Sequence, residues 1–278
     1  MHPMLPFGLN HMTVPRASAR ALLSVAESLG CVGVELRNDL GRPLFDGDPA
    51  ADLAATAAVH GQEILGLAEF KAFNEVPEDK LDQAEALISA AVNCGAKCVA
   101  LIPAMAKGRV DRGDQRSALR QALALLQPIL ENRAIQGLIE PLGFANSSLR
   151  FKEDLVAALD EMQRPDCFAL IHDTFHHTLA GGGPLYADLT AIVHISGVTN
   201  PAPGVGQMRD ADRVLLDARD RLGTIAQLRS LRAAGYTGPA SFEAFAPEIH
   251  EMNDPTAALA GSIAFITSQL AEVSAGAA

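Results

Sequence analysis

The stretch Phe168-Ala-Leu-Ile-His-Asp173 is an apolar run of strand length that ends on two ionisable residues. A second run, Cys98-Val-Ala-Leu-Ile102, is apolar at every position. Continuous apolar runs of this kind are typical of strands that are buried on both faces. Because such burial occurs mainly in parallel sheets flanked by helices, both runs favour a parallel sheet.

Strand-length runs of this type alternate with Ala/Leu-rich segments of helical spacing along the chain. We expect strands at 7–12, 31–37, 63–69, 98–103, 136–142, 168–174, 191–197 and 239–244. We expect helices at 17–29, 49–60, 79–94, 115–133, 151–162, 184–190, 222–234 and 255–273. Eight such units in 278 residues give about 35 residues each, which predicts one α/β domain over residues 1–278, a (β/α)8 TIM barrel. A doubly wound open sheet is the rival fold, but no Gly-rich turn follows the first strand.

The composition excludes several classes of protein. Hydrophobic residues make up 49% of the chain, so it buries a core and is not a disordered protein. The net charge of −11 disfavours binding to nucleic acid or to an anionic membrane. No apolar run is long enough to span a bilayer, and residues 1–9 do not resemble a signal peptide. The four cysteines form no C-x-x-C pair, so we expect reduced thiols in a cytoplasmic protein.

Four ionisable residues stand inside or at the end of consecutive predicted strands: Glu140, Asp173, His194 and Glu243. In a barrel of this type the chemistry lies at the C-terminal ends of the strands. A single buried charge is costly unless it is paired or bound to a metal. Each residue alone fits a structural ion pair or hydrogen bond, but four on adjacent strands indicate a metal site. This set of three carboxylates and one imidazole fits a site for Mn²⁺, Mg²⁺ or Co²⁺ better than it fits a thiolate-type zinc site.

Longer motifs surround these four residues. They are Ile139-Glu-Pro-Leu-Gly-Phe144, Asp173-Thr-Phe-His-His177 and Ser241-Phe-Glu-Ala-Phe-Ala-Pro247, together with the strand that carries His194. With them the chain resembles the xylose-isomerase-like TIM barrels, a family of sugar isomerases and epimerases that shares its fold with endonuclease IV. The stretches Pro165–His176 and Asp212–Val214 are most similar to the inosose (2-keto-myo-inositol) isomerases within that family.

The resemblance implies a role for each matching residue. Glu140, Asp173, His194 and Glu243 match the metal ligands, and Glu140 and Glu243 also match the pair of carboxylates that transfer protons. His176 and Arg213 match residues that contact the substrate. One divalent ion is implied, with Mn²⁺ preferred over Mg²⁺, Co²⁺ or Zn²⁺, and a small keto-sugar or inosose as the partner, in inositol catabolism or other carbohydrate metabolism. A homo-oligomer is compatible with such barrels.

The chain departs from its relatives in two places at the rim of the site. No Pro-Gly-x-Gly segment follows Arg213, and the first strand ends in Asn10-His-Met12, where relatives often carry an acidic residue. Both departures concern substrate choice rather than the chemistry. Arg37 and Lys71 are further candidates for substrate binding or for ion pairs, and Gly181-Gly-Gly183 fits either a phosphate cradle or a plain loop.

These observations predict a metal-dependent isomerase or epimerase of an inosose or free keto-sugar, which moves protons through a metal-stabilised enediolate. Three alternatives use the same fold. The first is a ketose 3-epimerase, or a hydroxypyruvate-type isomerase or dehydratase. The second is a nuclease similar to endonuclease IV, which would require more histidine ligands and a basic surface. The third is a sugar-binding protein without activity, and the intact set of four ionisable residues disfavours it.

Overall fold

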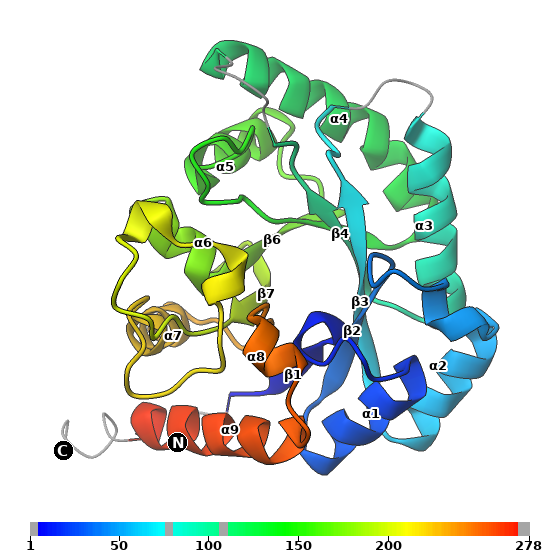
Figure 1. Ribbon diagram of the computed structural model, residues 1–278. Coiled ribbons are helices and arrows are strands. Elements are labelled where there is room, and N and C mark those ends of the chain that lie inside the picture. The colour runs from blue at the N-terminus through cyan, green and yellow to red at the C-terminus, as the bar shows by residue number, and fades with distance from the viewer. Residues whose placement is uncertain (1–4, 76–79, 106–110, 272–278) are drawn as a thin grey trace.

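Eight parallel strands close into a barrel in sequence order, with β1 paired to both β2 and β8 (Figure 1). The computed structural model describes residues 5–75, 80–105 and 111–271. The strands are β1 (Phe7–Asn10), β2 (Gly33–Arg37), β3 (Glu63–Lys71), β4 (Cys98–Ile102), β5 (Gln136–Ile139), β6 (Phe168–Asp173), β7 (Thr190–Ile195) and β8 (Ala240–Phe242). The predicted TIM barrel is confirmed, and each predicted strand overlaps a strand of the structure.

Helices surround the barrel and cover its outer face (Figure 1). They are α1 (Ala19–Ser28), α2 (Ala50–Val59), α3 (Leu81–Cys94), α4 (Arg112–Arg133), α5 (Lys152–Glu161), α6 (Thr174–Leu179), α7 (Thr224–Ala233), α8 (Pro247–His250) and α9 (Pro255–Ala271). Among the described residues, no helix is both long enough and apolar enough to cross a membrane. The four cysteines are buried and form no disulfide.

The helix predicted at 184–190 is wrong. The helix between β6 and β7 is α6, which begins immediately after β6, because the Asp173 carboxylate accepts a hydrogen bond from the His176 N–H at 2.8 Å and caps it. Gly181, Gly182 and Gly183 then follow with positive φ. Residues 184–189 form a loop whose apolar side chains pack against the core, which explains the misleading pattern. The three glycines follow the C-terminal end of α6, so the phosphate cradle lacks the helix N-terminus that it requires.

Side chains alternate between the inside and the outside of the barrel along each strand. The inner side chains of the middle of the barrel are small or aliphatic, and they form one cluster: Leu65, Ala68, Cys98, Ala100, Leu138, Ala169, Ile171 and Ile192. Two residues further along β5, β6 and β7 from Leu138, Ile171 and Ile192, the inward positions are ionisable. The outward side chains of the strands pack beneath the helices in a larger aliphatic core.

A buried lysine lies outside the barrel, between α5, α6 and β6. The Lys152 amine donates to Nδ1 of His172 at 2.5 Å and to Nδ1 of His177 at 3.1 Å. His172 is the outward neighbour of Asp173, and its Nε2 donates to Gln227. Burial lowers the pKa of Lys152 to about 7, against the opposing effect of Asp173 and Glu153.

We expect this lysine to make the fold less stable at pH 7 than at pH 10. The unfolded chain binds a proton at Lys152 below its ordinary pKa of 10.5, whereas the folded chain binds it only near 7. The free energy of unfolding therefore rises with pH across this window. Lys152→Met should raise it relative to the wild type by roughly 1–4 kcal/mol more at pH 7 than at pH 10, as measured by urea denaturation at both pH values.

Lys97→Met is the matched control, because this lysine is exposed and pairs with Glu63 at the surface. Its effect on the free energy of unfolding should be small and the same at both pH values. If Lys152→Met changed the free energy of unfolding by the same amount at pH 7 and at pH 10, the lowered pKa of Lys152 would be contradicted.

Candidate metal centre

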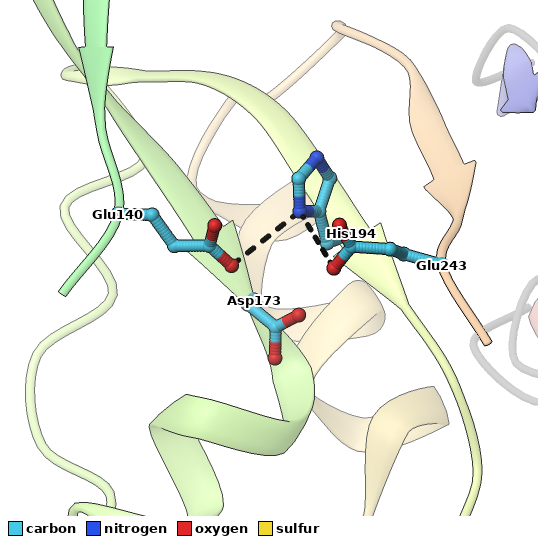
Figure 2. Close-up of side chains that lie close together, drawn as sticks. All are labelled: Glu140, Asp173, His194 and Glu243. Atoms are coloured by element: carbon cyan, nitrogen blue, oxygen red, sulfur yellow. Dashed lines mark ion pairs between the residues drawn. The ribbon is translucent and has the colours of Figure 1, made fainter. Parts of the chain in front are cut away.

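The four predicted side chains meet at the C-terminal end of the barrel (Figure 2). Asp173 ends β6 and His194 lies in β7, while Glu140 and Glu243 follow directly after β5 and β8. One possible ligand atom from each of the four lies within 4.8 Å of the other three, and all four residues are buried. The strand register explains the convergence, since His194 is paired with Asp173 on one side and with Ser241, two residues before Glu243, on the other.

His194 lies between Glu140 and Glu243 in the cluster (Figure 2). Its Nδ1 is 3.4 Å from Oε1 of Glu140 and 3.2 Å from Oε2 of Glu243. On the other side of the ring, Nε2 donates to Oε2 of Glu35 at 3.0 Å. Burial lowers the pKa of His194, but the charges of Glu243, Glu35 and Glu140 outweigh it and hold this pKa well above its ordinary value.

Two arginines neutralise part of the negative charge. Nη2 of Arg213 donates to Asp173 at 2.5 Å and to Oε2 of Glu243 at 2.9 Å. Nη1 of Arg37 donates to Oε1 of Glu243 at 3.0 Å, and the side-chain amide of Asn10 donates to the same oxygen at 3.2 Å. Glu243 therefore receives hydrogen bonds on both carboxylate oxygens.

The two glutamates consequently differ in their tendency to hold a proton. Burial would raise the pKa of Glu243, but His194 and Arg213 hold it well below the ordinary value. Burial raises the pKa of Glu140 to about 7, and the nearby Glu243 charge adds to this effect while His194 opposes it. Two carboxylates in one site with divergent pKa values are typical of an acid and base pair.

Arg213 is enclosed between two aromatic rings. Its guanidinium carbon lies 5.0 Å from the centre of the Phe175 ring and 4.5 Å from that of Phe245. The side chain is 1% exposed, although it comes from the long connection between β7 and α7. The stacking and the two carboxylates fix the guanidinium in one place.

His176 lies in the first turn of α6, beside the capping carboxylate of Asp173. Its ring packs edge-on against Phe144 and Phe175 at centroid distances of 5.0 and 5.2 Å. Burial lowers the pKa of His176, so the ring is neutral at pH 7. Its Nδ1 has no hydrogen-bond partner among the described residues. The structure thus leaves one polar atom of His176 available for a ligand.

The residues present fit a divalent cation. Nδ1 of His194 and Oε1 of Glu140 are both buried in ion pairs, and neither makes a hydrogen bond to any residue that the structure describes. Buried polar atoms without a partner are costly, and a cation between them would remove this cost. A set of three carboxylates and one imidazole suits a hard or borderline ion, and Mn²⁺, Mg²⁺, Co²⁺ and Zn²⁺ are compatible with it.

Of the two further candidates, Arg37 is part of the site and Lys71 belongs to its rim. Arg37 is buried and pairs with Asp39, Glu69 and Glu243. Lys71 pairs with Glu69 at 2.6 Å, and its side chain is 65% exposed. Ion pairing therefore describes both better than direct substrate binding does.

Sequence reasoning missed Glu35, and it placed Asn10 at the rim of the site rather than against Glu243. Glu35, in β2, contacts His194 across the interior of the barrel, and Asn10, in β1, contacts Glu243 from the strand that is paired with β8. A signal was present, because Glu35 and Arg37 are charged residues spaced by two within a predicted strand. Such spacing places both on the same face, which here is the inner one.

Residues 23–269 match the protein family described as xylose isomerase-like TIM barrel. No curated protein matches the chain by sequence. A solved xylose isomerase domain containing protein from Salmonella typhimurium LT2 is 27% identical, with a TM-score of 0.88 over 98% of this chain and 99% of that chain. The IolI protein with a bound zinc atom is 19% identical, with a TM-score of 0.84 over 97% and 98%. The 3-keto-D-glucoside 4-epimerase from E. coli is 16% identical, with a TM-score of 0.69 over 95% and 99%. The last two likenesses show that the fold is shared.

We expect the affinity of the cluster for a divalent cation to rise with pH. In the ion-free protein Glu140 holds a proton below about pH 7 and His194 holds one to higher pH, and a bound cation must displace both. Affinity should fall by roughly tenfold or more from pH 7 to pH 6. Calorimetric titration with Mn²⁺ in buffers of different ionisation enthalpy counts the released protons directly. An affinity that is constant from pH 6 to pH 8, without proton release, would contradict these protonation states.

Proposed function

The chain belongs to the xylose isomerase-like TIM barrel family, and from this membership and the geometry of the buried cluster we propose that it is a metal-dependent isomerase or epimerase of a keto-polyol. One observation carries the proposal. Glu140, Asp173, His194 and Glu243 converge at the C-terminal end of the barrel, and one buried atom each of Glu140 and His194 lacks a hydrogen-bond partner among residues 5–75, 80–105 and 111–271. An inosose or a free keto-sugar is the substrate that we propose.

The four clustered residues would hold the ion, His194 through Nδ1 and the others through carboxylate oxygens. When bound, a divalent ion polarises a ketone and its neighbouring hydroxyl and makes the adjacent C–H more acidic. Mn²⁺ is our first choice because three of the four donors are carboxylates. The zinc atom of the IolI structure, which has a similar fold, supports Zn²⁺ as an alternative.

Proton transfer is assigned to the two glutamates. Glu243, whose pKa is held low, is ionised and removes a proton from the carbon beside the ketone. The electron pair of the broken C–H bond then moves toward the ketone oxygen. Glu140 stands on the other side of His194 from Glu243 and is the second proton carrier.

The position to which the proton returns decides the product. Return to the same carbon from the opposite face inverts its configuration, which is epimerisation. Return to the former carbonyl carbon, with transfer of the hydroxyl proton to the other oxygen, moves the ketone along the chain or ring, which is isomerisation. Glu140 and Glu243 come from strands on different sides of β6 and β7, and this arrangement supports transfer on either face.

His176 and Arg213 are assigned to the substrate oxygens. Nδ1 of His176 lacks a partner in the described part of the chain, so it is available for a hydrogen bond with a substrate oxygen. Arg213 presents a fixed positive charge beside Asp173 and Glu243, where negative charge develops on the substrate. Both residues therefore position and polarise the substrate, while the glutamates move the proton.

The charges around the site favour an uncharged substrate. Arg37 and Arg213 both donate to carboxylates of the protein, so neither offers a free cation for a phosphate group. This supports a free keto-polyol over a sugar phosphate. A ketose 3-epimerase, or a hydroxypyruvate-type isomerase or dehydratase, remains the alternative on the same geometry. A cytoplasmic location and a homo-oligomer remain predictions.

The proposal is tested by hydrogen exchange in D₂O. The Mn²⁺-loaded protein, incubated with 2-keto-myo-inositol and with a panel of free ketohexoses, should introduce deuterium at a carbon beside the ketone of at least one of them. Glu243→Gln should lower the exchange rate by roughly 10²–10⁴-fold, because it removes the base while nearly preserving the volume of the side chain. Proton NMR follows the loss of the C–H signal and identifies the carbon.

Glu251→Gln is the matched control, because this exposed glutamate lies beyond β8 in α8's C-terminal cap position, outside the cluster. It should leave the exchange rate unchanged. Stoichiometric metal without exchange on any keto-polyol would favour a dehydratase or another lyase. Failure of the protein to bind any of the four candidate ions would overturn the metal centre itself.

A further inference from the structure

Glu35 is a buried acidic residue that the proton-transfer scheme does not use. It lies in the middle of β2, across the barrel from β7, and is 3% exposed. Its Oε2 accepts the hydrogen bond from Nε2 of His194 at 3.0 Å. Its Oε1 is buried, and no described residue forms a hydrogen bond with it. The hydrogen bond to His194 is therefore the contact that compensates this carboxylate for its burial.

This contact determines which nitrogen of His194 faces the cluster. An ionised carboxylate only accepts hydrogen bonds, so Nε2 of the imidazole must carry a proton. When a cation displaces the second ring proton, the lone pair of the ring lies on Nδ1, which points between Glu140 and Glu243. Without Glu35, this acceptor for the Nε2 proton would be lost, and the contacts of Nδ1 alone would orient the ring.

We infer that Glu35 is a positioning residue that fixes the ring of His194, with Nε2 protonated, and presents Nδ1 as the metal-binding atom. This inference rests on the proposed metal-dependent function. Histidine ligands commonly donate their second ring N–H to a carboxylate, which orients the ring and makes the ligating nitrogen more basic. Here the carboxylate comes from a strand on the opposite wall of the barrel, so the ring is held from both sides.

The packing beside Glu35 supports a fixed position for its side chain. A Cβ added to Gly66, in β3, would lie 2.8 Å from Sγ of Cys98 and 4.0 Å from Oε2 of Glu35. A larger residue at this position would clash with the Cys98 thiol and would contact the Glu35 carboxylate. Gly66 thus leaves the space that the Cys98 thiol occupies next to the pair of Glu35 and His194.

The stability of the fold does not by itself explain a glutamate at this position. A buried carboxylate with one unpartnered oxygen costs free energy, whereas an aliphatic residue in the same interior would not. The hydrogen bond to His194 recovers part of this cost. A residue that is costly to bury and that touches one member of the cluster is better explained by its effect on that member.

Calorimetric titration with Zn²⁺ tests the inference in the full-length protein, without reference to activity. Glu35→Leu removes the acceptor and should weaken Zn²⁺ binding by roughly 10–100-fold. Glu35→Gln keeps an acceptor oxygen of nearly the same geometry, and it should lose less than Glu35→Leu does. Glu69→Gln is the matched control, because it removes a buried carboxylate in the neighbouring strand β3. The Glu69 carboxylate pairs with Arg37 and Lys71 but not with His194. The Zn²⁺ affinity of Glu69→Gln should stay within about threefold of the wild type, well short of the loss expected for Glu35→Leu.

Histidine-selective ¹⁵N NMR of the Zn²⁺-loaded protein supplies a second measurement that loss of packing alone would not change. Wild type should show a His194 ring N–H proton that exchanges slowly with water, assigned by its absence in His194→Gln. Glu35→Gln should retain this signal and Glu35→Leu should lose it. If Glu35→Leu bound Zn²⁺ as tightly as the wild type does and kept the His194 ring N–H signal, the inference about Glu35 would be overturned. Absence of Zn²⁺, Mn²⁺, Co²⁺ and Mg²⁺ binding by wild type would instead overturn the proposed function on which it rests.

Discussion

Mutual repulsion among three buried carboxylates is the constraint on which the site depends. Glu140, Asp173 and Glu243 approach within 4.8 Å of one another and of His194, at a depth where solvent screens charge poorly. The protein compensates with two positively charged groups. The imidazole of His194 contacts Glu140 and Glu243, and the guanidinium of Arg213 contacts Asp173 and Glu243. The compensation is incomplete, because Oε1 of Glu140 and Nδ1 of His194 make no hydrogen bond within the part of the chain that the structure describes. A divalent cation placed between them completes it, and this links the electrostatics of the site to the chemistry that we propose.

The barrel supplies the geometry that such a cluster requires. Side chains two residues apart along a strand point to the same side of the sheet. The inward positions that follow Leu138, Ile171 and Ile192 are therefore occupied by the ionisable residues of the cluster. The closed parallel sheet then brings residues that are far apart in sequence to the same end of the barrel. Glu35 and His194, which are 159 positions apart, form a hydrogen bond across the interior in this way. Rigid strands rather than loops therefore hold most of the proposed machinery, while Arg213 is brought in from a loop and fixed by Phe175 and Phe245.

The four clustered residues could be predicted from sequence because an ionisable residue that interrupts or ends a continuous apolar run is conspicuous. Glu140, Asp173, His194 and Glu243 all have this signature, and the structure brings them together. Glu35 lacks it, since Gly33-Val-Glu-Leu-Arg37 also reads as a strand with one polar face toward solvent, and only closure of the barrel turns that face inward. The loop at 184–190 was mistaken for a helix for a related reason. Its apolar residues pack against the core from an irregular backbone, so their spacing reflects tertiary contacts rather than helical periodicity. Asp173 caps α6 and so sets the start of that helix, while it also belongs to the acidic cluster. Its sequence pattern was interpreted only as part of the cluster.

The most direct test of the metal centre is anomalous diffraction from crystals of the protein grown with Mn²⁺. We predict one strong anomalous peak inside the barrel, at roughly 2.0–2.6 Å from carboxylate oxygens of Glu140, Asp173 and Glu243 and from Nδ1 of His194. The ring of His194 should keep its Nε2 directed at Glu35. A map with no peak between these four side chains at saturating Mn²⁺, and with Arg213 still bridging Asp173 and Glu243, would contradict the account. In that case the cluster would be a structural ion network rather than a metal centre.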